Sequence, residues 1–136
     1  MQLLLLQILR FIFQNPIFKV LRIFQFLLAI GIFFTFALMP VNNTPSNIPP
    51  AALHFTGNLL LITSAWVALL EYLKTSRIFI LSAVLSLCSE LAQSLTTTRI
   101  TDPMDLGYNL IGLSVGVLIC FMLNYLLNTK HITVLN

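Results

Sequence analysis

Side chains capable of acid–base or strong hydrogen-bond chemistry are few in this chain and concentrate in one stretch. Of 136 residues only four are acidic and seven basic, and three of the acids, Glu90, Asp102 and Asp105, lie close together. Glu90 falls near the end of one strongly apolar run, and Asp105 and Asn109 open the next. Because an ionised carboxylate in hydrocarbon costs several kcal/mol unless it is paired, these groups must serve one another or a ligand.

Apolar runs must hold these residues in place. The chain is 58% hydrophobic and 8% charged, against roughly a quarter charged in ordinary soluble domains, which indicates a membrane protein. Four runs approach or exceed the roughly 20 apolar residues that cross a bilayer as a helix. They are Ile23–Met39, Leu53–Tyr72, Ile78–Leu95 and Leu106–Leu127. The predicted fold is therefore all-α, a polytopic bundle of four transmembrane helices.

The chain before the first run divides at Asn15 and Pro16. Proline is favourable in a first helical turn, so the first transmembrane helix is expected to begin near Pro16, and the four-helix domain to cover residues 16–130. Residues 1–15 are apolar but too short to span, and they lack the charge order and cleavage site of a secretory signal. They form either a short helix at the membrane interface or an extension of the first transmembrane helix.

The basic residues predict the orientation. All seven except Arg99 precede the first span, fall between the second and third, or follow the fourth. This positive-inside asymmetry predicts that both termini are cytoplasmic and that Arg99 and the loop before Leu53 face outward. Glu71, which lies near Lys74 at the cytoplasmic boundary, is expected to be solvated.

Polar residues form one stripe on each of the last three predicted helices. Within each helix they are three or four positions apart, so they share a face. The second helix carries His54 and Asn58, the third Ser82, Ser86, Glu90 and Gln93, and the fourth Asp105 and Asn109. Asn58, Glu90 and Asn109 fall at similar depths. The stripes should therefore meet in one outward-facing polar cluster, with His54, Gln93, Arg99 and Asp105 around its mouth.

Two glycines and an aspartate have direct structural interpretations. Gly112 and Gly116 lie on the same face as Asn109, and glycines four apart let another helix approach closely. This face is expected to pack against the second or third helix. Asp102 precedes a proline and is typical of an N-cap. Asp105 is equally well explained by the free amides of the first turn or by membership of the cluster.

Other members of the cluster also have simpler explanations. Arg99 could balance the nearby aspartates, His54 could reach the membrane surface, and Asn58 could tie two helices together. Glu90 is the strongest functional candidate, because a carboxylate buried within a span marks a functional site by default. It is the one candidate for a catalytic group.

Several classes of function are excluded by the sequence. There is no run of basic residues for nucleic acid, and no heme, flavin or nucleotide motif. The two histidines lie on opposite predicted sides of the membrane, so no metal site is expected. Cys88 and Cys120 lie in apolar runs at different depths, where each is expected to pack as a small hydrophobic residue. We therefore expect no cofactor, metal or nucleic-acid partner.

The spacing of the polar residues resembles that of the VanZ-like family of small bacterial membrane proteins. The resemblance consists of Glu90-x-x-Gln93, Arg99, Asp105, Asn109 and Gly112, with His54-Phe55 opening the preceding helix. It covers roughly Leu53 to Gly116. It implies a four-helix protein of the bacterial cytoplasmic (inner) membrane whose polar centre faces the cell exterior, and which is linked in the founding case to low-level teicoplanin resistance. The resemblance supplies no mechanism.

Three functions fit these observations. The first is an envelope protein whose polar cluster binds a membrane lipid, a lipid-linked cell-wall precursor or the lipid tail of a glycopeptide. The second is a structural or assembly subunit that binds a membrane-protein partner or a second copy of itself. The third is an enzyme acting on lipid head groups, with Glu90 as general base assisted by His54 and Arg99.

Overall fold

Four long helices make up most of the described chain. The computed structural model describes residues 7–8, 11–40, 43, 47–96 and 102–129, with side chains as far as Tyr125. The helices are α2 (Pro16–Leu38), α3 (Pro50–Leu69), α4 (Thr75–Ser94) and α5 (Pro103–Thr129). Each is long and apolar enough to cross a membrane, and no strand occurs in the described ranges. The predicted all-α bundle with four spans is confirmed.

Prolines begin three of the helices. Pro16, Pro50 and Pro103 are the first residues of α2, α3 and α5, where a missing N–H costs nothing because that donor has no partner within the helix. Before α2, the Asn15 side chain accepts a 2.9 Å hydrogen bond from the amide of Ile17, and the Asn15 backbone is extended. Chain direction therefore changes at Asn15.

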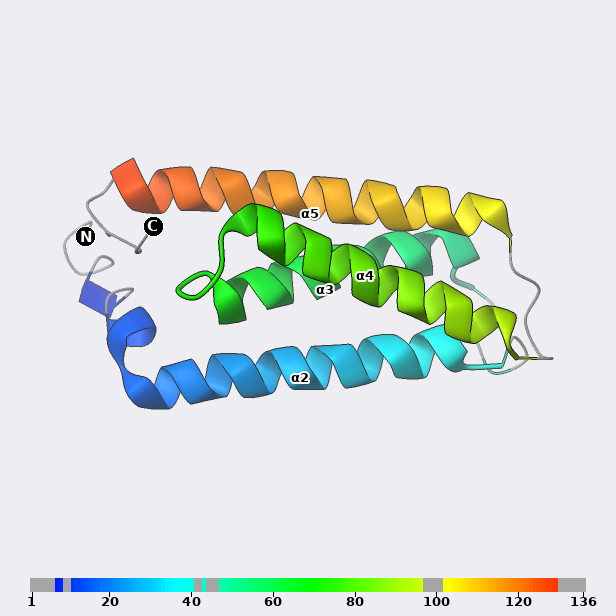
Figure 1. The fold of residues 1–136 in the computed structure, drawn as a ribbon, viewed down its shortest axis with the longest axis horizontal. Helices are drawn as coiled ribbons and strands as arrows, with labels where there is room; N and C mark the ends of the chain where they lie inside the picture. The colour runs from blue at the N-terminus through cyan, green and yellow to red at the C-terminus, as the bar shows by residue number, and fades with distance from the viewer. Residues whose placement is uncertain (1–6, 9–10, 41–42, 44–46, 97–101, 130–136) are drawn as a thin grey trace.

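The residues before Asn15 do not continue α2. Residues 11–14 are helical and turn away from its axis (Figure 1). This arrangement favours a separate short helix over an extension of the first span. Its position at a membrane interface stays a prediction.

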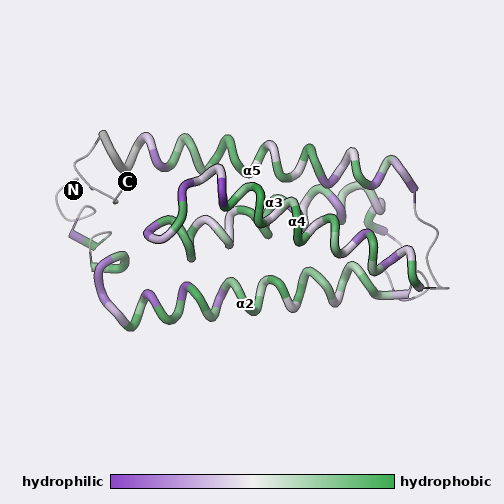
Figure 2. Tube along the Cα trace, in the orientation of Figure 1, coloured by the Kyte–Doolittle hydropathy of each residue, from purple (hydrophilic) through white to green (hydrophobic). Residues whose placement is uncertain are grey.

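The helices run alternately up and down. The start of α2, the turn between α3 and α4, and the last turns of α5 lie at one end of the bundle (Figure 1). Hydrophilic segments are found at both ends, whereas the middle of each helix is mostly apolar (Figure 2). This topology agrees with the predicted alternation of sides. Which end faces the cytoplasm stays a prediction.

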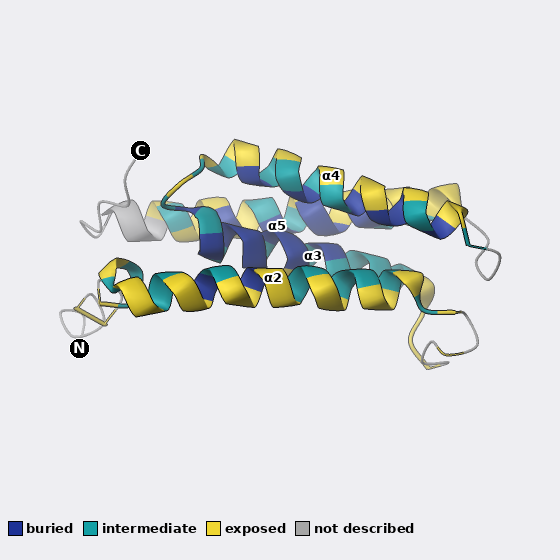
Figure 3. Ribbon diagram, turned by 60° about the horizontal axis from the view of Figure 1, so that its bottom comes forward, coloured by how far each residue is buried: buried dark blue, intermediate teal, exposed yellow. Residues whose placement is uncertain are grey.

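Helix α3 is the centre of the bundle. It packs against α2, α4 and α5, most extensively against α5, while α2 and α5 do not contact one another over the described residues. Buried residues accordingly gather on α3, and most of α2 is exposed (Figure 3). Only Arg22 and Phe26 of α2 are buried. Helix α2 is therefore the least embedded wall of the bundle.

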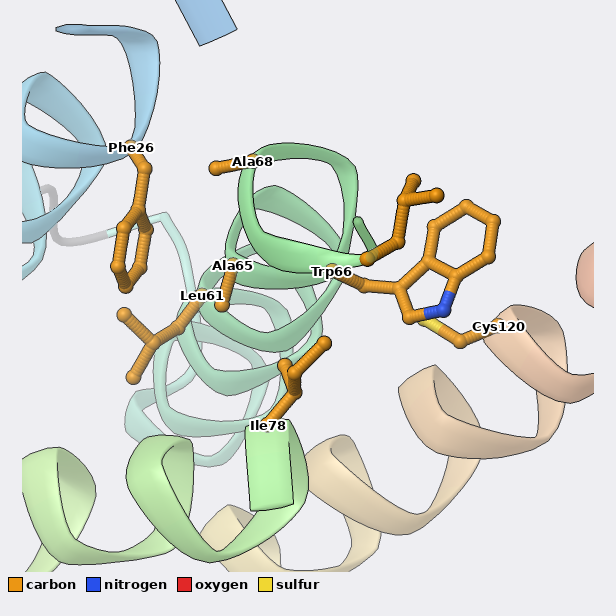
Figure 4. Close-up of a cluster of buried hydrophobic side chains, with 8 residues drawn as sticks. Phe26, Leu61, Ala65, Trp66, Ala68, Ile78 and Cys120 are labelled. Atoms are coloured by element: carbon orange, nitrogen blue, oxygen red, sulfur yellow. The ribbon is translucent and has the colours of Figure 1, made fainter. Parts of the chain in front are cut away.

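The apolar core lies toward the end of the bundle that holds the α3–α4 turn. Trp66 of α3 packs beside Cys120 of α5, and Phe26 of α2 lies near Leu61 (Figure 4). Burying aromatic and aliphatic groups of this kind is worth about 1.5–3 kcal/mol each in water. Cys120 fills the core as expected. Cys88 is exposed on α4, so the expectation that it would be packed was wrong, because its position faces away from α3 and α5.

Candidate functional site

The imidazole of His54 is the centre of the polar cluster. Its Nδ1 lies 3.1 Å from Asn109 Oδ1 and 3.3 Å from Glu90 Oε1, and its Nε2 lies 3.4 Å from Asp105 Oδ2. These partners come from α4 and α5, and the His54 side chain is 9% exposed. One side chain of α3 thus joins all three inner helices.

Two asparagines complete this cluster. Asn58 Nδ2 donates to Asn109 Oδ1 at 2.6 Å and to the carbonyl of His54 at 2.9 Å. Asn109 Nδ2 in turn donates to Glu90 Oε1 at 2.5 Å. Asn58, Asn109 and Glu90 are all buried. We call the set His54, Asn58, Glu90, Asp105 and Asn109 the His54 cluster.

Glycines on α5 allow the cluster to assemble. A Cβ at Gly112 would overlap the carbonyl oxygen of Phe55, and one at Gly116 would overlap a methyl group of Ile62. Both neighbours belong to α3, so the glycine face of α5 lies directly on the backbone of α3. This close approach carries Asn109, one turn earlier on α5, to the side chains of His54 and Asn58.

Both nitrogens of the His54 ring face oxygens of other side chains. Nδ1 faces the oxygens of Asn109 and Glu90, and an ionised carboxylate only accepts hydrogen bonds, so Nδ1 must carry a hydrogen. Nε2 faces an oxygen of Asp105, so a hydrogen bond there needs a second proton, either on Nε2 or on the carboxyl group. His54 therefore has a carboxylate on each side of its ring.

A cavity of about 810 Å³ opens beside the cluster, between α2 and α3. Such a volume is within the range of about 300–1,000 Å³ that is usual for small-molecule sites. Its polar lining at one end comes from His54, Asn58, Gln93, Asp102 and Asp105. Its apolar lining includes Ala29, Ile32, Phe33 and Phe36 of α2, and Leu60 and Leu61 of α3. The cavity therefore has titratable side chains at one end, a mostly apolar middle, and the uncharged polar side chains of Gln25 and Ser64 toward its other end.

The remaining predicted site residues lie in different places. Gln93 does not join the His54 cluster: its Nε2 donates to the carbonyl of Ala37 in α2 at 2.8 Å, across the cavity. Asp102 accepts a 2.9 Å hydrogen bond from the amide of Met104, so it caps α5. Arg99 lies outside the described residues. In the described part of the chain no group of His, Cys, Asp and Glu side chains is arranged to hold a metal ion.

A second polar cluster lies at the opposite end of the bundle, and the sequence did not predict it. Glu71 forms ion pairs with Lys19 at 2.9 Å and with Arg22 at 3.1 Å. Arg22 also donates to the carbonyls of Ile12 and Phe13, and its guanidinium lies 4.6 Å from the centre of the Phe13 ring. We call Lys19, Arg22 and Glu71 the Arg22 cluster.

The expectation that Glu71 is solvated was wrong. Its side chain is 15% exposed, because two cations of α2 and the preceding segment cover it. The available signal was the spacing of Lys19 and Arg22, three positions apart and therefore on one face of α2. The same charges also mark the predicted orientation, which needs no contact between them.

Comparison with known proteins identifies the family. The family model VanZ/LLP1 matches residues 2–124, nearly the whole chain. Searches of curated proteins and of solved structures each gave no match. The matched region contains α2, α3, α4, most of α5 and every residue of the His54 cluster. The chain therefore belongs to the VanZ/LLP1 family.

Proposed function

We propose that this protein binds an amphipathic ligand of the bacterial cytoplasmic membrane in the cavity between α2 and α3. The polar head would lie at His54 and Asp105, and the hydrocarbon part between α2 and α3. The ligand is a membrane lipid, a lipid-linked cell-wall precursor or the lipid tail of a glycopeptide, and its capture would alter susceptibility to teicoplanin. Both termini would be cytoplasmic, which puts the polar end of the cavity in the outer leaflet.

The single observation that supports this proposal is the graded lining of the cavity. Its titratable side chains, His54, Asp102 and Asp105, lie at the ends of α3 and α5 that begin these helices, whereas the rest of its lining is uncharged and mostly apolar. A lipid in a bilayer has the same gradient, with its head group at the interface and its chain in the core. A small polar metabolite would leave the apolar part of the lining without a matching group.

A catalytic role has less support. In the enzyme hypothesis Glu90 acts as a base with help from His54, but both imidazole nitrogens already contact carboxylates, and Glu90 accepts from Asn109. Each of these groups would have to exchange a partner before it could take a proton from a substrate. Glu90 does not line the large cavity. We therefore assign it a positioning role, orienting His54 and Asn109.

A cavity-filling substitution tests the proposal. Ala29 lines the cavity, whereas a Cβ at Gly31, two positions further on, meets nothing within 4 Å and Gly31 is exposed. Lipids that copurify with the native protein would be compared with those of Ala29→Trp and, as a matched control, Gly31→Trp. Ala29→Trp should lose the retained lipid and the effect on teicoplanin susceptibility, and Gly31→Trp should keep both. Identical lipid content in all three proteins would contradict the proposal.

A further inference from the structure

The charge at the polar end of the cavity is negative. Three of the four acids of the whole chain, Glu90, Asp102 and Asp105, are at this end, and Asp102 and Asp105 line the cavity itself. His54 is the one basic side chain described there. Of the seven lysines and arginines, only Arg99 falls in the segment that joins α4 to α5. Even if His54 and Arg99 were both charged beside the three carboxylates, the sum would be −3 + 2 = −1.

An orphaned acceptor at the same place points to a ligand. Asn58 lines the cavity, is 1% exposed, and its Oδ1 has no hydrogen-bond partner in the described structure. Its amide nitrogen is already fully used, on Asn109 and on the His54 carbonyl. A buried oxygen of this kind is costly unless a donor reaches it. The polar end of the cavity thus combines carboxylates with an acceptor that lacks a donor.

We infer that the cavity selects an amphiphile whose head group is a cationic hydrogen-bond donor, an amine, over one with a free phosphate. This inference rests on the proposed function and specifies its ligand. An ammonium group has three donors and no acceptor, which suits Asn58 Oδ1 and the carboxylates of Asp102 and Asp105. A fully ionised phosphate offers only hydrogen-bond acceptors, and its negative charge would lie beside two carboxylates of the same sign.

The dimensions of the cavity fit a single hydrocarbon chain. On α3 its lining extends from Pro50 to Val67, and the part from His54 to Val67 covers roughly 20 Å at about 1.5 Å per residue. The far part of this lining contains Gln25 and Ser64, whose side chains are hydrogen-bonded to each other across the α2–α3 interface. This contact restricts further penetration. The chain would therefore lie along α3 with its tail toward the Gln25–Ser64 pair.

Three probes with one chain and different heads test the inference. Full-length protein in phosphatidylcholine nanodiscs would be titrated with hexadecylamine, hexadecyl phosphate and hexadecanol, and bound probe counted by native mass spectrometry. Hexadecylamine should bind at least about tenfold more tightly than the phosphate, the effect expected for one or two hydrogen bonds between charged groups. Asp105→Asn should reduce this preference, because it removes a cavity-lining charge while keeping the size of the side chain.

The possible results separate the head group from the cavity. Equal or tighter binding of hexadecyl phosphate would overturn the inference while leaving lipid binding in the cavity intact. Equal binding of hexadecanol and hexadecylamine would overturn the requirement for a positive charge. If Ala29→Trp bound every probe as well as the native protein, the proposed function itself would fail. The comparison of the three probes on native protein does not depend on whether any variant folds.

Discussion

The two polar clusters at opposite ends of the bundle are built in different ways. In the Arg22 cluster two cations face one carboxylate, and backbone carbonyls accept from Nη1 and Nη2 of Arg22, whereas its Nε has no partner in the described structure; none of its residues lines the large cavity. In the His54 cluster carboxylates and amides surround one imidazole, an amide oxygen is left over, and the cavity opens beside it. Each cluster has one buried polar atom without a partner among the described residues, but only the atom of the His54 cluster belongs to a residue that lines the cavity. The Arg22 cluster fastens α2, whereas the His54 cluster is placed to meet a further partner.

The orientation of the bundle determines which side of the membrane each cluster faces. It predicts a yes-or-no result for reporter fusions. Reporter fusions at Asn136 and at Thr97 should report opposite sides of the membrane, with Asn136 cytoplasmic, because all basic residues except Arg99 fall on one side. The Arg22 cluster then lies at the cytoplasmic end and the His54 cluster at the outer end. Reports from the same side would exclude the model of four spans.

Glu71→Ala should cause the largest loss of stability. It leaves the buried guanidinium of Arg22 without its carboxylate, and breaking a buried ion pair in this way costs about 3–5 kcal/mol. Thermal unfolding in detergent measures the loss. Lys19→Ala is the matched control, since the Lys19 side chain is 37% exposed and such a pair contributes about 0–1 kcal/mol.

Protein with Glu71→Ala that remains folded should still retain lipid. If folded Glu71→Ala protein lost its retained lipid, the two clusters would not have separate roles.

Gly116→Leu should separate α5 from α3 and so disturb the His54 cluster, which depends on the close approach of these two helices. The added side chain meets Ile62 and Leu59 of α3, and overpacking of this kind costs about 1–3 kcal/mol. Gly107→Leu, on the same helix, meets nothing within 4 Å and should leave the melting temperature unchanged. Equal melting temperatures for the two variants would mean that α5 does not need its close approach to α3.

Glu90→Gln should affect function more than stability. Glutamine keeps the size of the side chain and an oxygen for Asn109, so the cost in unfolding free energy should be about 1 kcal/mol. It removes the negative charge beside His54 Nδ1, so we expect loss of the retained lipid and of the teicoplanin phenotype. A variant that folds and keeps both would make the His54 cluster a structural element like the Arg22 cluster.

Asp105→Asn and Arg99→Gln should give the smallest losses of lipid retention. Asp105 lines the cavity together with Asp102, so one carboxylate remains there, and asparagine still offers an oxygen to His54 Nε2. Retained lipid per protein measures the effect, with Glu90→Gln as the reference. A larger loss for Asp105→Asn than for Glu90→Gln would transfer the main role from the buried carboxylate to the one that lines the cavity.

The sequence predicted the His54 cluster well because helical spacing determines which residues share a face. The positions of Asn58, Glu90 and Asn109 along their helices were enough to set a common depth. His54 was expected at the mouth of the cluster and lies instead at its centre. The spacing of Gly112 and Gly116 indicated which face of α5 could approach a neighbour, though not that the neighbour would be α3.

The cavity and the Arg22 cluster could not be predicted in the same way. Both depend on how far α2 stands from α3, which the residue pattern along α2 does not determine. Burial of Arg22 further depends on residues 11–14 folding back toward α2. Gln93 shared a stripe with Glu90, yet its amide donates to the carbonyl of Ala37 in α2 and does not join the His54 cluster. Spacing sets direction from the axis but not partners at a distance.

The bond from Gln93 to the carbonyl of Ala37 has a consequence for the bilayer around the protein. Ala37 is in the last turn of α2, and Arg22 holds the same helix near its start. The two attachments are about 22 Å apart at about 1.5 Å per residue. A helix fixed at both ends cannot tilt or slide freely to match a thicker or thinner membrane. Hydrophobic mismatch would therefore be relieved by deformation of the surrounding lipid, and not by movement of α2.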